Sequence, residues 1–303
     1  MMNQSPEQSH ITSFSYLLVG SLSLFLAFPL FIFIHKQFPD YGWPFHFDRI
    51  LMFMVIVVFT LLLLRLFRPI IVIAFSITLA WLSFGSFTGS YGFQNLVTDY
   101  KSMMYSLKYE PNEEGYDGEG DSNFSYKNEI LAATDYSDRV VRDFAVVATN
   151  SYFRSEQARY EGHRTLIQCF AVFKKINRSW NYVNDPVSRE YFAKASESVK
   201  LMAGDCDDHA IVMVGAIKSI GGTARFVSTT NHLYPEILIG NKNDLEFVNY
   251  LIKKILFPTE SAGQDIHYHK DDSGKIWLNL DYTASYPGGK YLAEPILGTL
   301  RPK

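Results

Sequence analysis

The chain is poor in cysteine, and its charge is close to balanced. It holds only two cysteines, Cys169 and Cys206, in 303 residues, and their separation fits neither a disulfide framework nor a zinc site. Its net charge of −3 gives no basic surface for nucleic acid. It also lacks a glycine-rich phosphate loop and a dinucleotide fingerprint. We therefore expect no cofactor, no metal and no nucleic-acid partner, and one cysteine is available for chemistry.

Charge is nearly absent from three long stretches near the N-terminus. We expect residues 1–90 to form a membrane region with about three transmembrane helices, at 14–34, 49–67 and 69–88. The first stretch is about 31 Å long as a helix, which matches the hydrocarbon core of a bilayer. No Lys or Arg precedes it, so an anchor is favoured over a cleaved signal peptide. Buried helices of a soluble core are the alternative. The chain is thus predicted to be a multi-pass protein of a bacterial inner membrane.

The basic residues that flank these stretches do not agree on an orientation. Arg65 and Arg68 argue that the link between the second and third stretches is cytoplasmic, whereas Lys36, Arg49 and Lys101 argue for the opposite side. We expect the domain that follows to lie outside the cytoplasm.

The remaining two thirds of the chain have the composition of a soluble α+β domain. Residues 91–130 are predicted to be a linker with an acidic, glycine-rich stretch, and the domain is predicted to cover 131–303. Helical periodicity marks 138–153 and 166–176. Cys169 falls within the second of these helices and is expected in the core.

Cys206 follows Gly204 and Asp205 at the start of an apolar helical pattern that ends at Gly221 and Gly222. Asp205 is a strong N-cap candidate, which makes Cys206 the first helical residue. The positive end of the helix dipole lowers the pKa of a thiol in that position. Asp207 and its neighbour Asp208 oppose a thiolate, however, so activation also requires a base.

A base and an acid lie further along the chain. Segments 223–228, 232–239 and 276–281 alternate as strands. If the last two are antiparallel neighbours, His232 at the start of one lies beside Asp281 at the end of the other. Asp281 then orients the imidazole of His232, and His232 takes the proton of the Cys206 thiol.

These motifs resemble the transglutaminase-like superfamily, in particular its bacterial membrane-anchored members. The similarity covers about residues 138–290, and its blocks are 180–186, 195–199, 204–210, 221–227, 231–237 and 277–281. The resemblance implies a papain-like fold, with a cysteine helix packed on an antiparallel β-sheet. It further implies Cys206 as the nucleophile, His232 as the base and Asp281 as the orienting acid.

Two features depart from the family pattern. Leu233 and Tyr234 follow the histidine, where the family often has a small residue and then an aromatic one, so the resemblance does not extend to the shape of the pocket. An insertion at about 241–275 separates His232 from Asp281.

The predicted function is that of a membrane-anchored cysteine enzyme that attacks protein or peptide amide bonds and forms a thioester. A protease or amidase is favoured, and a cross-linking transglutaminase with an amine acceptor is an alternative. A catalytically silent module for assembly or partner binding is the non-enzymatic alternative. The expected partners are a protein or peptide substrate, the lipid bilayer, and a partner protein that is either in the membrane or encoded alongside this one.

Three features of the sequence allow more than one interpretation. Residues 245–257 are predicted to form an amphipathic helix that could act as a lid, lie on the membrane or bind a partner, but packing on the domain is favoured. His267, His269, Asp271 and Asp272 could bind a metal, although a polar loop is favoured. His209 lies about a turn after Cys206 and is expected beside the site rather than in it.

Overall fold

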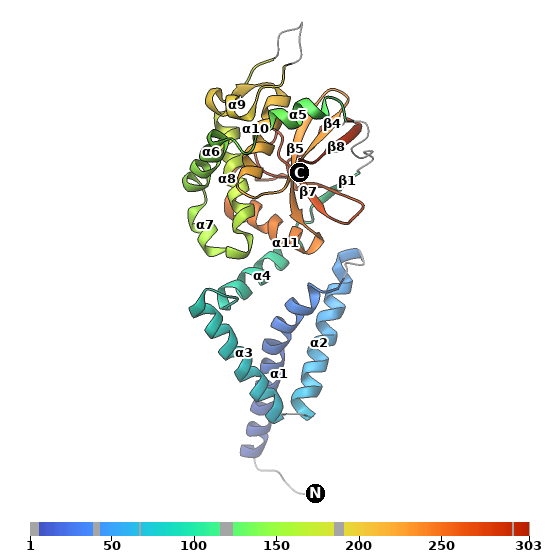
Figure 1. Cartoon of the computed structure of the whole chain (residues 1–303). Coiled ribbons are helices and arrows are strands. Elements are labelled where there is room, and N and C mark those ends of the chain that lie inside the picture. Colours follow the sequence, from blue (N-terminus) through green and yellow to red (C-terminus); the bar gives the residue numbers. More distant parts are fainter. Residues whose placement is uncertain are drawn as a thin grey trace. The chain divides into compact units, whose positions relative to one another are not determined.

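The computed structural model describes residues 6–38, 43–66, 68–115, 124–184, 191–292 and 294–302. The chain divides into two compact units, Met1–Leu107 and Lys108–Lys303. Both units are drawn in Figure 1.

The first unit is helical, and its elements are α1 (Pro6–His35), the short η1 (Pro44–His46), α2 (Phe47–Leu66), α3 (Arg68–Thr88) and α4 (Phe93–Ser106). Helices therefore form at all three predicted stretches. In the described part of the chain, only Pro44–Leu64 is long and apolar enough to cross a membrane, and Gly20–His35 is a shorter apolar helix. The structure thus supports one candidate span, and the predicted multi-pass arrangement is not supported.

Residues 91–130 contain regular structure where a linker was expected. Helix α4 belongs to the first unit, and β1 (Asn112–Glu114) and α5 (Lys127–Ala133) belong to the second. Strand β1 pairs in parallel with β6 (His267–Lys270), which lies far from it along the chain. Local composition could not reveal this long-range pairing. Residues 116–123, most of the acidic stretch, lie outside the described residues.

The second unit is α+β, as predicted. Its main sheet has six strands in the order β1-β6-β7-β5-β4-β8, and the strands not yet given are β4 (Ala224–Thr229), β5 (Leu233–Gly240), β7 (Ile276–Asn279) and β8 (Ile296–Leu300). All pairs except β1 with β6 are antiparallel. Strands β4, β5 and β7 lie at the places predicted from alternation.

Helices cover one face of this sheet (Figure 1). They are α6 (Arg139–Ser151), α7 (Arg154–Arg159), η3 (Glu161–His163), α8 (Arg164–Ser179), α9 (Ala195–Leu201) and α10 (Cys206–Ser219). A separate two-stranded ribbon pairs β2 (Asn181–Tyr182) with β3 (Ala203–Gly204). Helix α10 contacts β4 and β5 on one side and α6, α8 and α9 on the others, which explains why nearly its whole length is buried.

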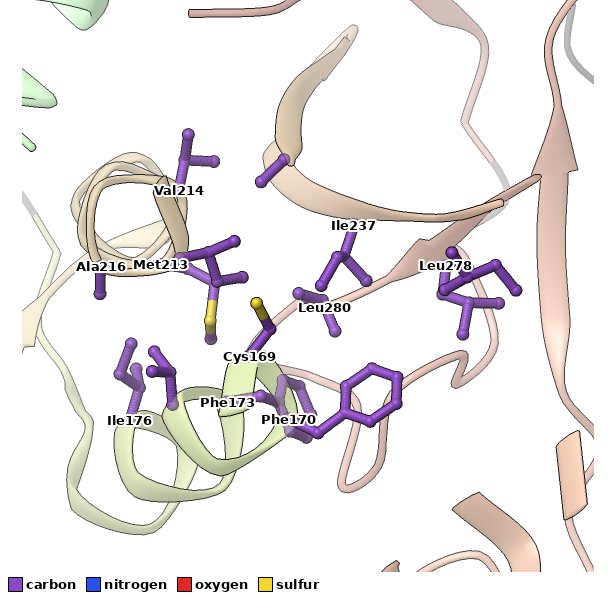
Figure 2. Packing of buried hydrophobic residues seen from close by; sticks show 14 of the residues in the cluster. Cys169, Phe170, Phe173, Ile176, Met213, Val214, Ala216, Ile237, Leu278 and Leu280 are labelled. Carbon is purple, nitrogen blue, oxygen red and sulfur yellow. The ribbon is translucent and has the colours of Figure 1, made fainter. Parts of the chain in front are cut away.

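The core lies between α8, α10 and the sheet (Figure 2). Cys169 of α8 points between Met213 of α10 and Leu280, and it is 1% exposed. Burial raises the pKa of the Cys169 thiol to about 12. Cys169 is therefore a packing residue, as expected.

The insertion is part of the domain rather than an appendage. It contains α11 (Lys242–Tyr250), a π-helical turn η4 (Leu251–Leu256) and β6. Leu245, Val248 and Leu251 are buried in the main core. The helix is therefore packed on the domain, which is the alternative that was favoured from the sequence. His267 and His269 lie in strand β6, however, and not in the polar loop that was favoured for them.

A buried ionic cluster occupies the sheet beside β6. Glu236 is fully buried and accepts hydrogen bonds from Arg225 at 2.7 Å, from His269 at 2.6 Å and from Tyr291 at 2.8 Å. The Arg225 guanidinium lies 4.2 Å from the centre of the Trp277 ring. Burial opposes the charge of Glu236, but Arg225 and His269 outweigh it and lower the pKa of the carboxyl to about 2.

Replacing Glu236 alone is expected to destabilise the second unit strongly. Glu236→Leu leaves the buried Arg225 without its carboxylate, which costs about 3–5 kcal/mol. Denaturant unfolding of the full chain, followed by tryptophan fluorescence, measures this loss. Adding Arg225→Met should restore much of the stability, and a double variant as unstable as the single one would contradict this account.

The same carboxyl predicts how stability depends on pH. Because the pKa of Glu236 is lowered to about 2 by folding, its contribution is complete above the unfolded value of about 4.3 and is lost as the pH falls toward 2. Unfolding midpoints measured from pH 6 to pH 2 should fall less steeply in the Glu236→Leu, Arg225→Met variant than in the wild type. Equal slopes would exclude Glu236 as a source of acid sensitivity.

Candidate active site

Cys206 begins helix α10 as the sequence predicts. The side chain of Asp205 is the N-cap and accepts hydrogen bonds from the backbone N–H groups of Asp207 at 3.0 Å and Asp208 at 3.4 Å. Gly204 has φ +156, and a Cβ there would lie 2.4 Å from the Asp208 carboxylate. The glycine therefore allows the chain to turn into the helix with the Asp208 side chain folded against it.

The environment of the thiol differs from the prediction. Cys206 Sγ donates to Asp207 Oδ1 at 3.4 Å. Burial, followed by the charges of Asp207 and Asp205, raises the pKa of Cys206 to about 12, although a hydrogen bond from the backbone N–H of Leu233 works in the opposite direction. The expected lowering by the helix N-terminus is therefore wrong, because desolvation and two neighbouring carboxylates outweigh the dipole. The inference that the thiol needs a base is strengthened.

His232 and Asp281 come together as predicted. His232 Nε2 lies 3.0 Å from Asp281 Oδ2, and both side chains are almost completely buried. The antiparallel register that pairs Glu236 with Asn279 brings the start of β5 to the end of β7. Residues 49 positions apart in the chain thus form a hydrogen-bonded pair.

Several bonds hold Asp281 as a carboxylate. Its Oδ2 also accepts from Thr283 Oγ1 at 2.6 Å, and its Oδ1 accepts from the backbone N–H of Tyr282 at 2.8 Å. Burial opposes the charge of Asp281, but the hydrogen bond and the charge of His232, together with Thr283, keep the pKa below its usual range. An ionised Asp281 favours the tautomer of His232 with its proton on Nε2, which leaves Nδ1 as the proton acceptor.

Cys206 lies next to this pair without being bonded to it. Its sulfur reaches the backbone N–H of Leu233, the residue directly after His232. Within the described residues, no hydrogen bond joins Cys206 to His232, and the thiol donates to Asp207 instead. Catalytic hydrogen bonds are often long or poorly aligned without substrate, and rotation about the Cα–Cβ bond of Cys206 redirects its S–H.

Two tyrosines that were not predicted from the sequence also lie at this site. The rings of Tyr182 and Tyr282 are stacked, with their centroids 4.9 Å apart, and Tyr282 also packs edge-on against His232 at 5.9 Å. Burial, followed by the charge of Cys206, raises the pKa of Tyr182 to about 12. Tyr282 directly follows Asp281, so its position after the predicted orienting acid was a usable signal. Tyr182 becomes a neighbour only through the pairing of β2 with β3.

A cavity of about 300 Å³ borders the loop that carries Asp281. Helix α8 contributes Lys174, Asn177 and Arg178 to its wall, and the loop contributes Tyr282 and Thr283. The lining of this cavity includes the residues that directly follow Asp281, but not Cys206, His232 or Asp281 itself. Among the described residues, no group of three or more His, Cys, Asp or Glu side chains is arranged to hold a metal ion.

Comparisons with protein-family models, with curated proteins and with solved structures found no match to this chain. The resemblance to the transglutaminase-like superfamily therefore depends on the motifs alone and stays a prediction.

Proposed function

We propose that this protein is a cysteine enzyme that cleaves protein or peptide amide bonds with Cys206, His232 and Asp281. The observation that carries the proposal is the buried His232–Asp281 pair, with 3.0 Å between Nε2 and Oδ2. The pair lies beside a cysteine at a helix N-terminus. An imidazole oriented by a carboxylate next to a nucleophile is the arrangement that acyl transfer requires.

The proposed reaction assigns a step to each of these groups. His232 Nδ1 takes the thiol proton, and the sulfur of Cys206 attacks the amide carbonyl carbon. The C–N bond then breaks, the proton passes from His232 to the leaving amine, and a thioester remains. Water, deprotonated by His232, hydrolyses the thioester and frees the thiol. The backbone N–H of Cys206 lies in the first turn of α10, where N–H groups have no acceptor within the helix, and it can stabilise the oxyanion.

The proposal includes a papain-like, transglutaminase-like architecture. It is supported by helix α10, which carries Cys206 and packs against the antiparallel strands β4 and β5. A membrane anchor is also proposed, because Pro44–Leu64 can span a bilayer and large apolar side chains such as Phe59 and Leu62 are exposed on it. Its location in a bacterial inner membrane, with the catalytic domain outside the cytoplasm, stays part of this proposal.

One observation favours the catalytically silent alternative. The thiol has a raised pKa and donates to Asp207 rather than to His232. An isolated thiol of this kind is a poor nucleophile at neutral pH. The two accounts therefore differ in whether His232 changes the reactivity of Cys206.

Alkylation by iodoacetamide tests the proposal. In the full-length protein with Cys169→Ala, the alkylation rate of Cys206 should be nearly independent of pH through the neutral range, because His232 removes the thiol proton. His232→Ala should lower the rate at pH 7 by about tenfold or more and make it rise steadily with pH, as for a lone thiol. Identical profiles in the two proteins would exclude His232 as the base and leave the silent module.

A further inference from the structure

His209 is a second histidine of the cysteine helix, and it is 0% exposed. It lies about one turn after Cys206 on α10. Its Nε2 is 3.3 Å from Asn177 Oδ1 on helix α8. The side-chain amide of Asn177 in turn donates from Nδ2 to the backbone carbonyl of Ala284 at 2.7 Å. Three separate segments are thus joined by one line of hydrogen bonds.

The chemistry of these groups sets the direction of each bond. The carbonyl of Ala284 can only accept, so the side chain of Asn177 must turn its NH₂ toward Ala284 and its oxygen toward His209. That oxygen also only accepts, so His209 must carry its proton on Nε2. His209 Nδ1 is then an unprotonated, buried nitrogen, and it has no hydrogen-bond partner in the part of the chain that the structure describes.

The far end of this line reaches the catalytic acid. The backbone N–H of Ala284 donates to the carbonyl of Asp281 at 3.0 Å, and Thr283 donates to the carboxylate of Asp281 at 2.6 Å. The residues from Asp281 to Ala284 therefore form one tight turn, which we call the acid loop. The near end of the line starts on the helix that carries the nucleophile.

Aromatic rings enclose His209 on its other sides. Its ring packs edge-on against Trp180, with centroids 5.3 Å apart, and against Tyr282, with centroids 5.8 Å apart. Tyr282 belongs to the acid loop and also contacts His232. The ring of His209 is thus in contact with the acid loop directly as well as through Asn177.

We propose that His209 and Asn177 are positioning residues that hold the acid loop in register with the cysteine helix. This inference rests on the proposed function, because the distance it controls is the one between Cys206 and the His232–Asp281 pair. Neither residue touches the reacting atoms, so both act through the groups they place.

The line requires a proton on Nε2 of His209, which the neutral tautomer described above carries. Burial lowers the pKa of His209 to about 4, and the charge of Asp281 and that of His232 act on it in opposite directions. The titratable groups that face His209 are Asp281 and Tyr282 from the acid loop and His232 from the start of β5. Above about pH 4 the imidazole is neutral, so through the neutral range Nε2 carries the proton that is donated to Asn177 and Nδ1 carries none.

Two variants are designed to break this line of hydrogen bonds while still filling the volume of the side chain that they replace. His209→Phe keeps a ring against Trp180 and Tyr282 but has no donor for Asn177. Asn177→Leu removes both of the bonds that Asn177 makes. His209→Gln supplies an N–H at a similar reach and should restore the bond. Asn249→Leu is the matched control, because buried Asn249 donates to the carbonyl of Tyr109 at 2.8 Å from α11, outside the site.

The measurement combines two readouts on the full-length protein with Cys169→Ala. The first is the pH profile of iodoacetamide alkylation at Cys206. The second is hydrogen–deuterium exchange of the segment 280–286. We expect His209→Phe and Asn177→Leu each to slow alkylation at pH 7 by about tenfold, and to make the acid loop exchange faster. The double variant should be no worse than either single one, because both break the same line. His209→Gln and Asn249→Leu should keep the wild-type profile.

The outcomes separate this inference from the proposed function. If the wild type itself lacks the His232-dependent profile, the proposed function fails, and exchange of the acid loop alone decides whether the line holds it. If the wild type has that profile and His209→Phe keeps it, the positioning role is overturned, even if the loop exchanges faster. Slower alkylation in Asn249→Leu as well would also overturn it, because the effect would then be general destabilisation.

Discussion

Cys206→Ser is expected to abolish acyl transfer while leaving the fold intact. The reporter is p-nitrophenyl acetate, whose acyl group the thiol takes up as it releases nitrophenolate, so no knowledge of the natural substrate is needed. The initial burst should equal one nitrophenolate per chain in the wild type and disappear in the variant. The rate should fall by roughly three orders of magnitude or more, as when a nucleophile is lost from a triad.

The structure explains why this variant should fold. Cys206 is only partly buried, and a serine hydroxyl can donate to Asp207 as the thiol does. The unfolding midpoint should therefore stay within experimental error of the wild type. Cys169→Ala is the control, because it removes a fully buried sulfur from the core and should cost stability but keep the burst. A burst that survives in Cys206→Ser would refute the nucleophile role.

Asp281→Asn is expected to lower the acylation rate by about 10²–10⁴-fold with little change in fold. The hydrogen bonds around the carboxylate give the reason. Oδ1 accepts from the backbone N–H of Tyr282, so an asparagine must keep its oxygen there and turn its NH₂ toward His232. That NH₂ donates to Nε2 and forces the imidazole proton onto Nδ1, the nitrogen that has to accept the thiol proton.

Thr283→Val is the matched control for this prediction. It removes one hydrogen bond to Asp281 Oδ2 but leaves the carboxylate in place to accept from Nε2. Its rate should fall much less than that of Asp281→Asn, and burst kinetics with p-nitrophenyl acetate measure both. If Asp281→Asn reacts at the wild-type rate, Asp281 has no part in the mechanism.

Local patterns were enough to find the elements that carry the site. Asp205, Gly221 and the apolar stripe between them predicted helix α10, and the structure has it at Cys206–Ser219. Alternation in 232–239 and 276–281 predicted two strands, and the ends of those strands predicted that His232 meets Asp281. Such predictions succeed because caps, turns and periodicity act between residues that are close in sequence.

Other features depended on contacts between distant segments. Strand β1 exists because β6 pairs with it, and His267 accordingly lies in a strand with Glu114 2.6 Å from its Nδ1. This pairing accounts for the regular structure at Asn112–Glu114, within the stretch predicted to be a linker. The multi-pass prediction relied on hydropathy alone, and among the described residues only Pro44–Leu64 is long and apolar enough to span a bilayer.

By itself, the sequence determined which residues are able to do chemistry and which elements carry them, because helix starts and strand ends are encoded locally. Only the tertiary structure decided how those residues behave. It partly buried the Cys206 thiol beside Asp207, and so raised a pKa that the helix end alone would lower. It also enclosed His209 and linked it through Asn177 to the acid loop. Desolvation and hydrogen bonding are set by every segment packed around a group, and that environment exists only after the chain has folded.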